Sequence, residues 1–141
     1  MRPARFQQLL LSAAAALPGA AAKTFADSGH SRHPYGVVVV GPGGRTSLWQ
    51  VVVVSANGER WEGDSDPEPV LGEKPVGPEM PVDLKDLAAI EHGLVAALLA
   101  ADPGEIAAVE VYSARSVPPA VGHGATLDLH DGSRAFINHV R

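Results

Sequence analysis

The segment ATLDLHDGSRAFINHV, residues 125–140, decides the fold, because it has the pattern of a β-hairpin with one buried face. Apolar and polar residues alternate on both sides of Asp131 and Gly132. A three-residue loop that ends with Gly132 in the left-handed conformation pairs Leu127 with Ala135 and keeps one face apolar. A two-residue loop would mix charged and apolar residues on each face, so the sequence predicts the three-residue register.

The same register predicts two side-chain contacts. Asp128 lies opposite Arg134, where the two can form an exposed ion pair. His123 and His139 lie opposite each other at the open end of the hairpin, close enough to share a metal ion. A zinc site needs a third protein ligand, which the pattern does not identify. A pair of histidines at the end of a sheet is therefore the favoured interpretation, and a metal site at His123 and His139 is the alternative.

Two valine-rich segments predict further strands. Residues 37–40 form a continuous β-branched run that is typical of a buried strand, and residues 47–56 predict a longer one. The GPGGRTS segment, residues 41–47, lacks the spacing and the lysine of a phosphate-binding loop and precedes a strand rather than a helix. Its first four residues, 41–44, therefore predict a turn.

The Asn57-Gly58 dipeptide predicts a tight hairpin turn after the second of these strands. The return strand would cover residues 59–62. Trp61 would then face Val54 across the hairpin, which favours a structural role for this tryptophan.

A helix is predicted between residues 83 and 101. Asp83 can cap its amino terminus, and Asp86 adds a negative charge in its first turn. The segment 102–104 ends the helix, and residues 105–113 predict another strand. The apolar stripe of the helix consists of Leu84, Leu87, Ile90, Leu94, Val95, Leu98 and Leu99.

Five prolines in residues 64–82 exclude a helix or a central strand over this segment. A structureless connection of this length is unusual within a compact domain. Two interpretations are open: a mobile acidic connection, which is favoured, and an arm that docks on a neighbouring subunit or another partner.

Residues 1–22 also allow two interpretations. A secretory leader would have Arg2 and Arg5 in its basic region, an apolar stretch over residues 9–17 and a cleavage site before Lys23. A folded helix would bury one apolar stripe and stop at Pro18-Gly19. The polar residues lie on one side, which favours the helix. The stripe consists of Phe6, Leu9, Leu10, Ala13, Ala14 and Leu17.

Composition excludes several classes of protein. The chain has 141 residues, 11 Lys and Arg against 16 Asp and Glu, and a net charge of -5, which disfavours general binding to nucleic acids. It has no cysteine, so thiol catalysis and cysteine-ligated metals are excluded. No run of apolar residues is long enough to span a membrane.

No catalytic motif stands out. Ser113 could complete a triad with Asp128 and His130, but nothing in the sequence positions it there. His92 follows Glu91 on the predicted helix without a second histidine one turn later, which favours a solvated face. His30 and His33 lie in the predicted loop over residues 24–35 without a ligand spacing. We therefore expect no enzyme activity and no cofactor.

The phrases PYGVVVVGPGG, SLWQVVVVSANGERW and GATLDLHDGSRAFI resemble small uncharacterised proteins of high-GC bacteria, over residues 34–62 and 83–138. That resemblance implies no known activity. The order of the predicted elements is also similar to that of phage tail-terminator and related tail-assembly proteins, with no diagnostic motif.

Together these patterns predict an α+β protein, with a largely antiparallel sheet of about five to six strands and one or two helices on one face. Residues 1–22 are the helix or leader, and residues 23–141 form one domain with the Pro-rich loop at 64–82. We expect a non-enzymatic binding or assembly module that self-associates or docks on a protein partner through sheet edges and the Pro-rich segment. The alternatives are a small His-dependent metal-binding protein or hydrolase, and a secreted inhibitor or adaptor. The expected location is cytoplasmic, or secreted if residues 1–22 are a leader.

Overall fold

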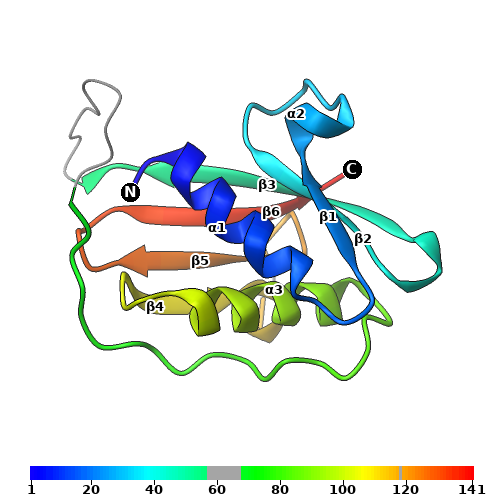
Figure 1. Cartoon of the computed structure of the whole chain (residues 1–141). Helices are drawn as coiled ribbons and strands as arrows, with labels where there is room; N and C mark the ends of the chain where they lie inside the picture. The colour runs from blue at the N-terminus through cyan, green and yellow to red at the C-terminus, as the bar shows by residue number, and fades with distance from the viewer. Residues whose placement is uncertain (57–67, 118) are drawn as a thin grey trace.

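The computed structural model describes residues 1–56, 68–117 and 119–141. Within them, six strands form one antiparallel sheet in the order β1-β2-β3-β6-β5-β4, with helices packed against it (Figure 1). The predicted α+β class is therefore confirmed. The predicted turn at residues 57–58, the return strand at 59–62 and Trp61 lie outside the described residues.

The strands are β1 (Ala21–Thr24), β2 (Gly36–Val40), β3 (Thr46–Val54), β4 (Ile106–Val111), β5 (Gly124–Leu129) and β6 (Arg134–Val140). The α-helices are α1 (Pro3–Ala15), α2 (Phe25–Ser28) and α3 (Leu87–Ala101). Two short 3-10 turns, η1 (Pro42–Gly44) and η3 (Tyr112–Ala114), follow β2 and β4. The turn predicted after residue 40 is thus confirmed.

The hairpin of β5 and β6 has the predicted register. Leu127 pairs with Ala135 and Asp128 pairs with Arg134, and Gly132 is left-handed with φ 88°. Arg134 Nε donates to Asp128 Oδ1 at 2.6 Å. Since both side chains are exposed, this ion pair contributes at most about 1 kcal/mol.

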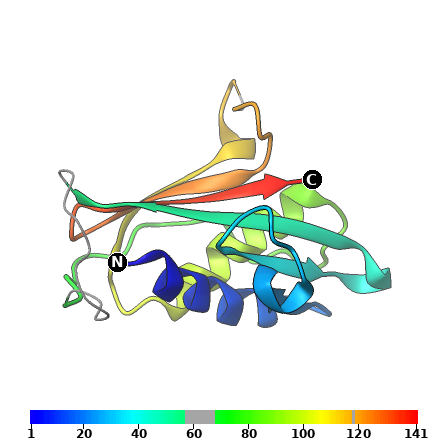
Figure 2. The same cartoon turned by 90° about the horizontal axis from the view of Figure 1, so that it is seen from above.

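The core lies between one face of the sheet and the two long helices. Both α1 and α3 lie on that face, while the segment between β4 and β5 projects from the other (Figure 2). Alternation along each strand directs every second side chain into this core. Its largest fully buried members are Trp49, Phe6, Leu10, Ile90, Leu94, Leu98, Leu127 and Ile137.

The amino-terminal segment forms the predicted helix. Phe6, Leu10, Ala13 and Ala14 are buried on one face of α1. They are four of the six residues of the predicted stripe, whose other members are Leu9 and Leu17. Whether residues 1–22 are removed as a leader stays a prediction.

The predicted loop over residues 24–35 contains more structure than expected. Thr24 ends β1, and its Oγ1 accepts a hydrogen bond from the N–H of Asp27, which caps the single turn of α2. A Cβ on Gly36 would lie 2.2 Å from the Phe25 ring. The ring therefore occupies the space that a side chain on residue 36 would need. A strand and a helix in so short a segment give no periodic signal.

Helix α3 begins later than predicted. Asp86, not Asp83, caps it, because Asp86 Oδ1 accepts from the N–H of Ala89 at 2.8 Å. Leu84 is buried although it precedes the helix, so the apolar stripe extends beyond the helical residues. The strand predicted over residues 105–113 is also shorter, since β4 ends at Val111 and η3 follows.

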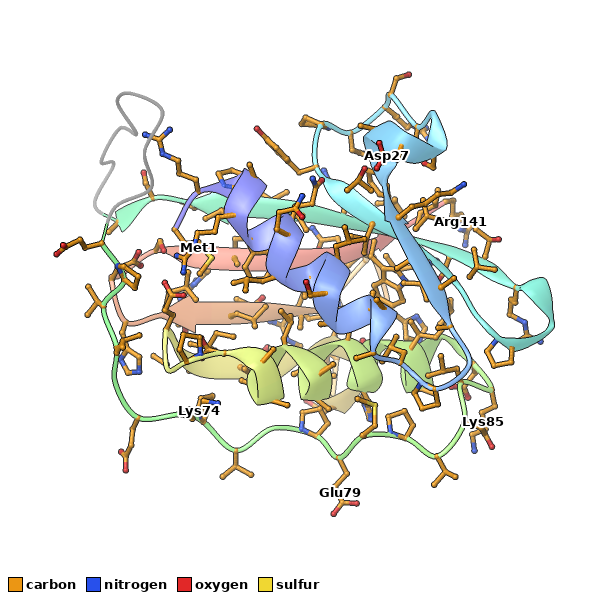
Figure 3. All side chains as sticks on the ribbon, viewed as in Figure 1. Met1, Asp27, Lys74, Glu79, Lys85 and Arg141 are labelled. Atoms are coloured by element: carbon orange, nitrogen blue, oxygen red, sulfur yellow. The ribbon has the colours of Figure 1, made fainter. Side chains whose placement is uncertain are left out.

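Residues 68–82, which we call the arm, run in an extended path beside α3 (Figures 1 and 3). Lys74 Nζ donates to the C=O of Leu99 at 3.0 Å, and the N–H of Gly72 donates to the C=O of Gly104 at 2.9 Å. A Cβ on Gly77 would lie 2.2 Å from Leu99 Cδ1, so a side chain at this position would displace the end of the Leu99 side chain. The arm is therefore docked on its own chain.

Candidate functional site

Strand β4 is the less protected of the two edges of the sheet. The opposite edge, β1, has four residues and carries Lys23, and shortness and a lysine both discourage pairing with another chain. Strand β4 has six residues, of which Glu110 alone is charged. It pairs with β5 on one side, and no described residue pairs with the other side.

The hydrogen bonds of β5 show which residue of β4 points outward. The N–H of Leu129 donates to Ser133, so Leu129 faces β6 and the preceding residue, Asp128, faces β4. Asp128 pairs with Ala108, and in an antiparallel ladder successive residues face opposite neighbours. Val109 therefore directs its N–H and C=O toward the open edge.

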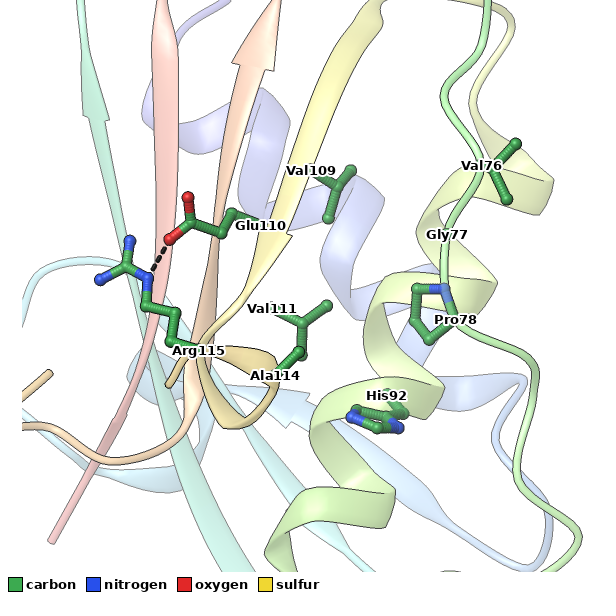
Figure 4. Close-up of a pocket in the computed structure, with 9 residues that line it drawn as sticks. All are labelled: Val76, Gly77, Pro78, His92, Val109, Glu110, Val111, Ala114 and Arg115. Atoms are coloured by element: carbon green, nitrogen blue, oxygen red, sulfur yellow. Dashed lines mark hydrogen bonds and ion pairs between the residues drawn. The ribbon is translucent and has the colours of Figure 1, made fainter. Parts of the chain in front are cut away.

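A groove of about 370 Å³ lies between this edge, α3 and the arm (Figure 4). Apolar side chains dominate it, and that of Val76 is 99% exposed. The groove is lined by Val76, Gly77, Pro78, His92, Val109, Glu110, Val111, Ala114 and Arg115.

The polar rim of the groove is fixed by Arg115. Its Nε forms an ion pair with the carboxylate of Glu110 (Figure 4), and its guanidinium lies 4.9 Å from the centre of the Tyr112 ring. The Tyr112 hydroxyl shares a hydrogen bond with Thr126 Oγ1 at 3.1 Å. These contacts hold η3 beside the end of β4.

A buried carboxylate lies next to the groove. Glu91 is 1% exposed, and it accepts hydrogen bonds from Ser113 Oγ through Oε1 and from the N–H of Gly124 through Oε2. The second bond is 2.7 Å long. The solvated position predicted for His92 agrees with its 40% exposed side chain, whereas the carboxylate of Glu91 beside it replaces water with two protein donors.

His92 joins the same cluster without completing a catalytic triad. Its Nε2 lies 3.0 Å from Ser113 Oγ and 3.6 Å from Glu91 Oε1. In a triad, the carboxylate orients the imidazole and the imidazole contacts the hydroxyl. Here the carboxylate binds the hydroxyl directly, so the cluster ties α3 to η3 and β5.

The triad considered from the sequence does not form. Ser113 contacts Glu91 and His92, whereas Asp128 pairs with Arg134. The histidine of that triad, His130, is also elsewhere, since its Nε2 lies 2.9 Å from the C=O of Glu73 in the arm.

His123 and His139 are adjacent, as their register predicts. The N–H of His139 donates to the C=O of His123 at 3.0 Å, and the ring centres are 6.4 Å apart. Within the described ranges, no group of three or more His, Cys, Asp or Glu residues could hold a metal ion. The metal site at this pair stays a prediction. His30 and His33 stack with ring centres 5.4 Å apart.

Comparison with known proteins gives no family for this chain. No protein-family model matches it, and neither a curated protein nor a solved structure does. Among the described residues, no helix is both long and apolar enough to cross a membrane. For the residues that the structure describes, the fold therefore defines an α+β protein whose six-stranded sheet has β1 and β4 as its edge strands.

The sequence contains no local signal for the groove. Its walls come from three segments, namely the arm, α3 and β4 with η3. The alternation of β4 predicts a strand but not its place at the edge of the sheet. The Glu91–Ser113 contact joins residues 22 positions apart, beyond the reach of any periodic pattern.

Proposed function

We propose that this chain is a non-enzymatic assembly module that self-associates by antiparallel pairing of its β4 edges. The observation that carries the proposal is the outward-facing backbone of Val109 on an edge strand without a second partner among the described residues. Unpaired strand edges join readily with a second strand, because each new backbone hydrogen bond satisfies a donor and an acceptor.

The sequence of β4 suits pairing about a two-fold axis. With the axis at Val109, this residue faces Val109 of the partner subunit and exchanges two backbone hydrogen bonds with it. Glu110 then faces Ala108 of the partner subunit, so the two glutamates are not directly opposed. The other outward-facing valine, Val111, is the last residue of the strand, so an axis there would pair fewer residues of β4.

The arm supports the same pairing. Val76 in the arm is 99% exposed beside β4, and Val109 is half-buried. A second copy paired with β4 would cover both side chains. Burying one valine side chain fully stabilises an interface by about 1.5 kcal/mol or more.

The oligomeric state of the full chain tests the proposal. Size-exclusion chromatography with light scattering should give twice the 14.6 kDa chain mass. Val109→Pro removes the outward donor but no hydrogen bond to β5, so this variant should be monomeric with an unchanged circular dichroism spectrum.

Val54→Lys provides the matched control. Val54 is 53% exposed and lies in β3, inside the sheet and away from β4, so its variant should stay dimeric. A wild-type chain that remains monomeric at every concentration would overturn the proposal. Equal dimerisation of the wild type and Val109→Pro would also overturn it.

A further inference from the structure

A second pocket lies where β6 ends and β5 begins. Its volume is about 550 Å³, larger than that of the β4 groove. It is lined by Leu87, Ala120, Val121, Gly122, His123, His139 and Arg141. The lining thus includes three side chains that can donate hydrogen bonds or carry positive charge, and no carboxylate side chain.

These three side chains have no hydrogen-bond partner within the described part of the chain. Neither the ring nitrogens of His123 and His139 nor the guanidinium of Arg141 contacts a described acceptor. The backbone bond between the two histidines fixes their spacing. The Trp49 ring, 5.3 Å from that of His139 between centres, fixes the orientation of the second imidazole.

The electrostatic effect of this arrangement is visible at His139. Burial lowers the pKa of His139, and the neighbouring His123 and Arg141 lower it further. The direction of this shift indicates that His123 and Arg141 lie close enough to His139 to disfavour a further positive charge there. Asp86, which caps α3, lines an adjoining pocket that shares Leu87 and His123 with this one, and its carboxylate accepts from the N–H of Ala89.

We propose that His123, His139 and Arg141 form a binding site for a small oxyanion of the phosphate type. A guanidinium offers a fork of N–H donors that matches two oxygens of such an anion, and each imidazole adds one donor. A metal ion is the poorer occupant, because the third group in the pocket has no lone pair to give.

Inorganic phosphate is the probe for this site. We would titrate it into the full chain at constant ionic strength and follow the imidazole resonances by NMR. The resonances of His123 and His139 should shift and saturate, while that of His30 stays in place. Arg141→Gln and His139→Gln should each weaken the binding about tenfold, as expected for the loss of one charge-assisted hydrogen bond.

Arg134→Gln is the matched control, because Arg134 begins the same strand that His139 nearly ends and lies outside the pocket. It should leave the affinity unchanged. Shifts that do not saturate, or equal weakening by Arg134→Gln and Arg141→Gln, would overturn the proposal. Saturable shifts with Zn²⁺ and none with phosphate would overturn it in favour of a metal site. The pocket shares no lining residue with the β4 groove, so its test does not depend on self-association.

Discussion

The carboxylate of Glu91 in α3 accepts a hydrogen bond from the backbone N–H of Gly124, the first residue of β5, at 2.7 Å. Its other oxygen accepts from Ser113 in η3. One buried side chain therefore joins the helix layer to both ends of the β4–β5 connection.

Removal of this carboxylate should destabilise the fold strongly. Glu91→Ala leaves a buried N–H without an acceptor and creates a cavity, so we expect the free energy of unfolding to fall by about 3 kcal/mol. Urea denaturation measures it. Ser113→Ala removes the contacts of the hydroxyl with Glu91 and His92 but leaves Gly124 paired, and should cost about 1 kcal/mol. Equal losses for the two variants would contradict a tie centred on Glu91.

Gly124 should be far less tolerant of a side chain than its neighbour Gly122. A Cβ on Gly124 would lie 2.0 Å from the backbone oxygen of Ile137, and its φ is 145°. We therefore expect Gly124→Ala to cost about 3 kcal/mol or more through overpacking and backbone strain.

Gly122 provides the control for this comparison. It has φ 80° with nothing within 4 Å of the Cβ position, so Gly122→Ala should cost only about 1 kcal/mol. Thermal unfolding of the two alanine variants measures both. Equal melting temperatures would show that the close approach of β5 to β6 is wrong.

The stability of the fold should depend on pH through His139. Burial, then His123 and Arg141, hold the pKa of His139 below 6.5 in the folded chain. The unfolded chain therefore binds this proton more readily than the folded chain. The free energy of unfolding should be highest above pH 6.5, and it should decrease as the pH drops from 6.5 through the folded pKa.

Urea denaturation between pH 8 and pH 5 measures this dependence. His139→Gln removes the titrating group and should give a flatter profile over the same range. An unchanged slope in His139→Gln would mean that another group is responsible.

Helix α1 should depend on an ion pair with the start of β4. Arg5 donates through both terminal nitrogens to the carboxylate of Glu105, at 2.8 and 2.7 Å, and Glu105 is buried. Arg5→Met leaves that carboxylate without its cation, so we expect a loss of about 2 kcal/mol. Arg5→Met combined with Glu105→Gln should lose less than the sum of the two single variants. Additive losses would contradict the coupling.

The elements that the sequence predicts well are those whose pattern is local. Alternation around Gly132 specifies the register of β5 and β6, because a shift of one residue would expose the apolar set. The start of α3 is not encoded in this way. Leu84 is buried without being helical, so hydrophobic periodicity alone extends the helix one turn too far.

The two candidate sites depend on contacts that are distant in the sequence. His123 and His139 could be paired from the hairpin register, but Arg141 joins them only once the end of β6 is placed. The β4 groove depends on the order of strands in the sheet and on the path of the arm. Neither follows from alternation or composition.

Disulfide cross-linking tests the proposed β4 pairing most directly, because the chain has no cysteine of its own. In the proposed dimer, Val109 faces its own copy, at the Cα separation of about 5.5 Å that suits a disulfide. Ala108 faces Glu110 of the partner subunit, so the two Ala108 residues of the dimer lie diagonally and too far apart for a disulfide. Val109→Cys should therefore form a covalent dimer under mild oxidation and Ala108→Cys should not. No cross-linking of Val109→Cys, or equal cross-linking of both variants, would contradict the pairing.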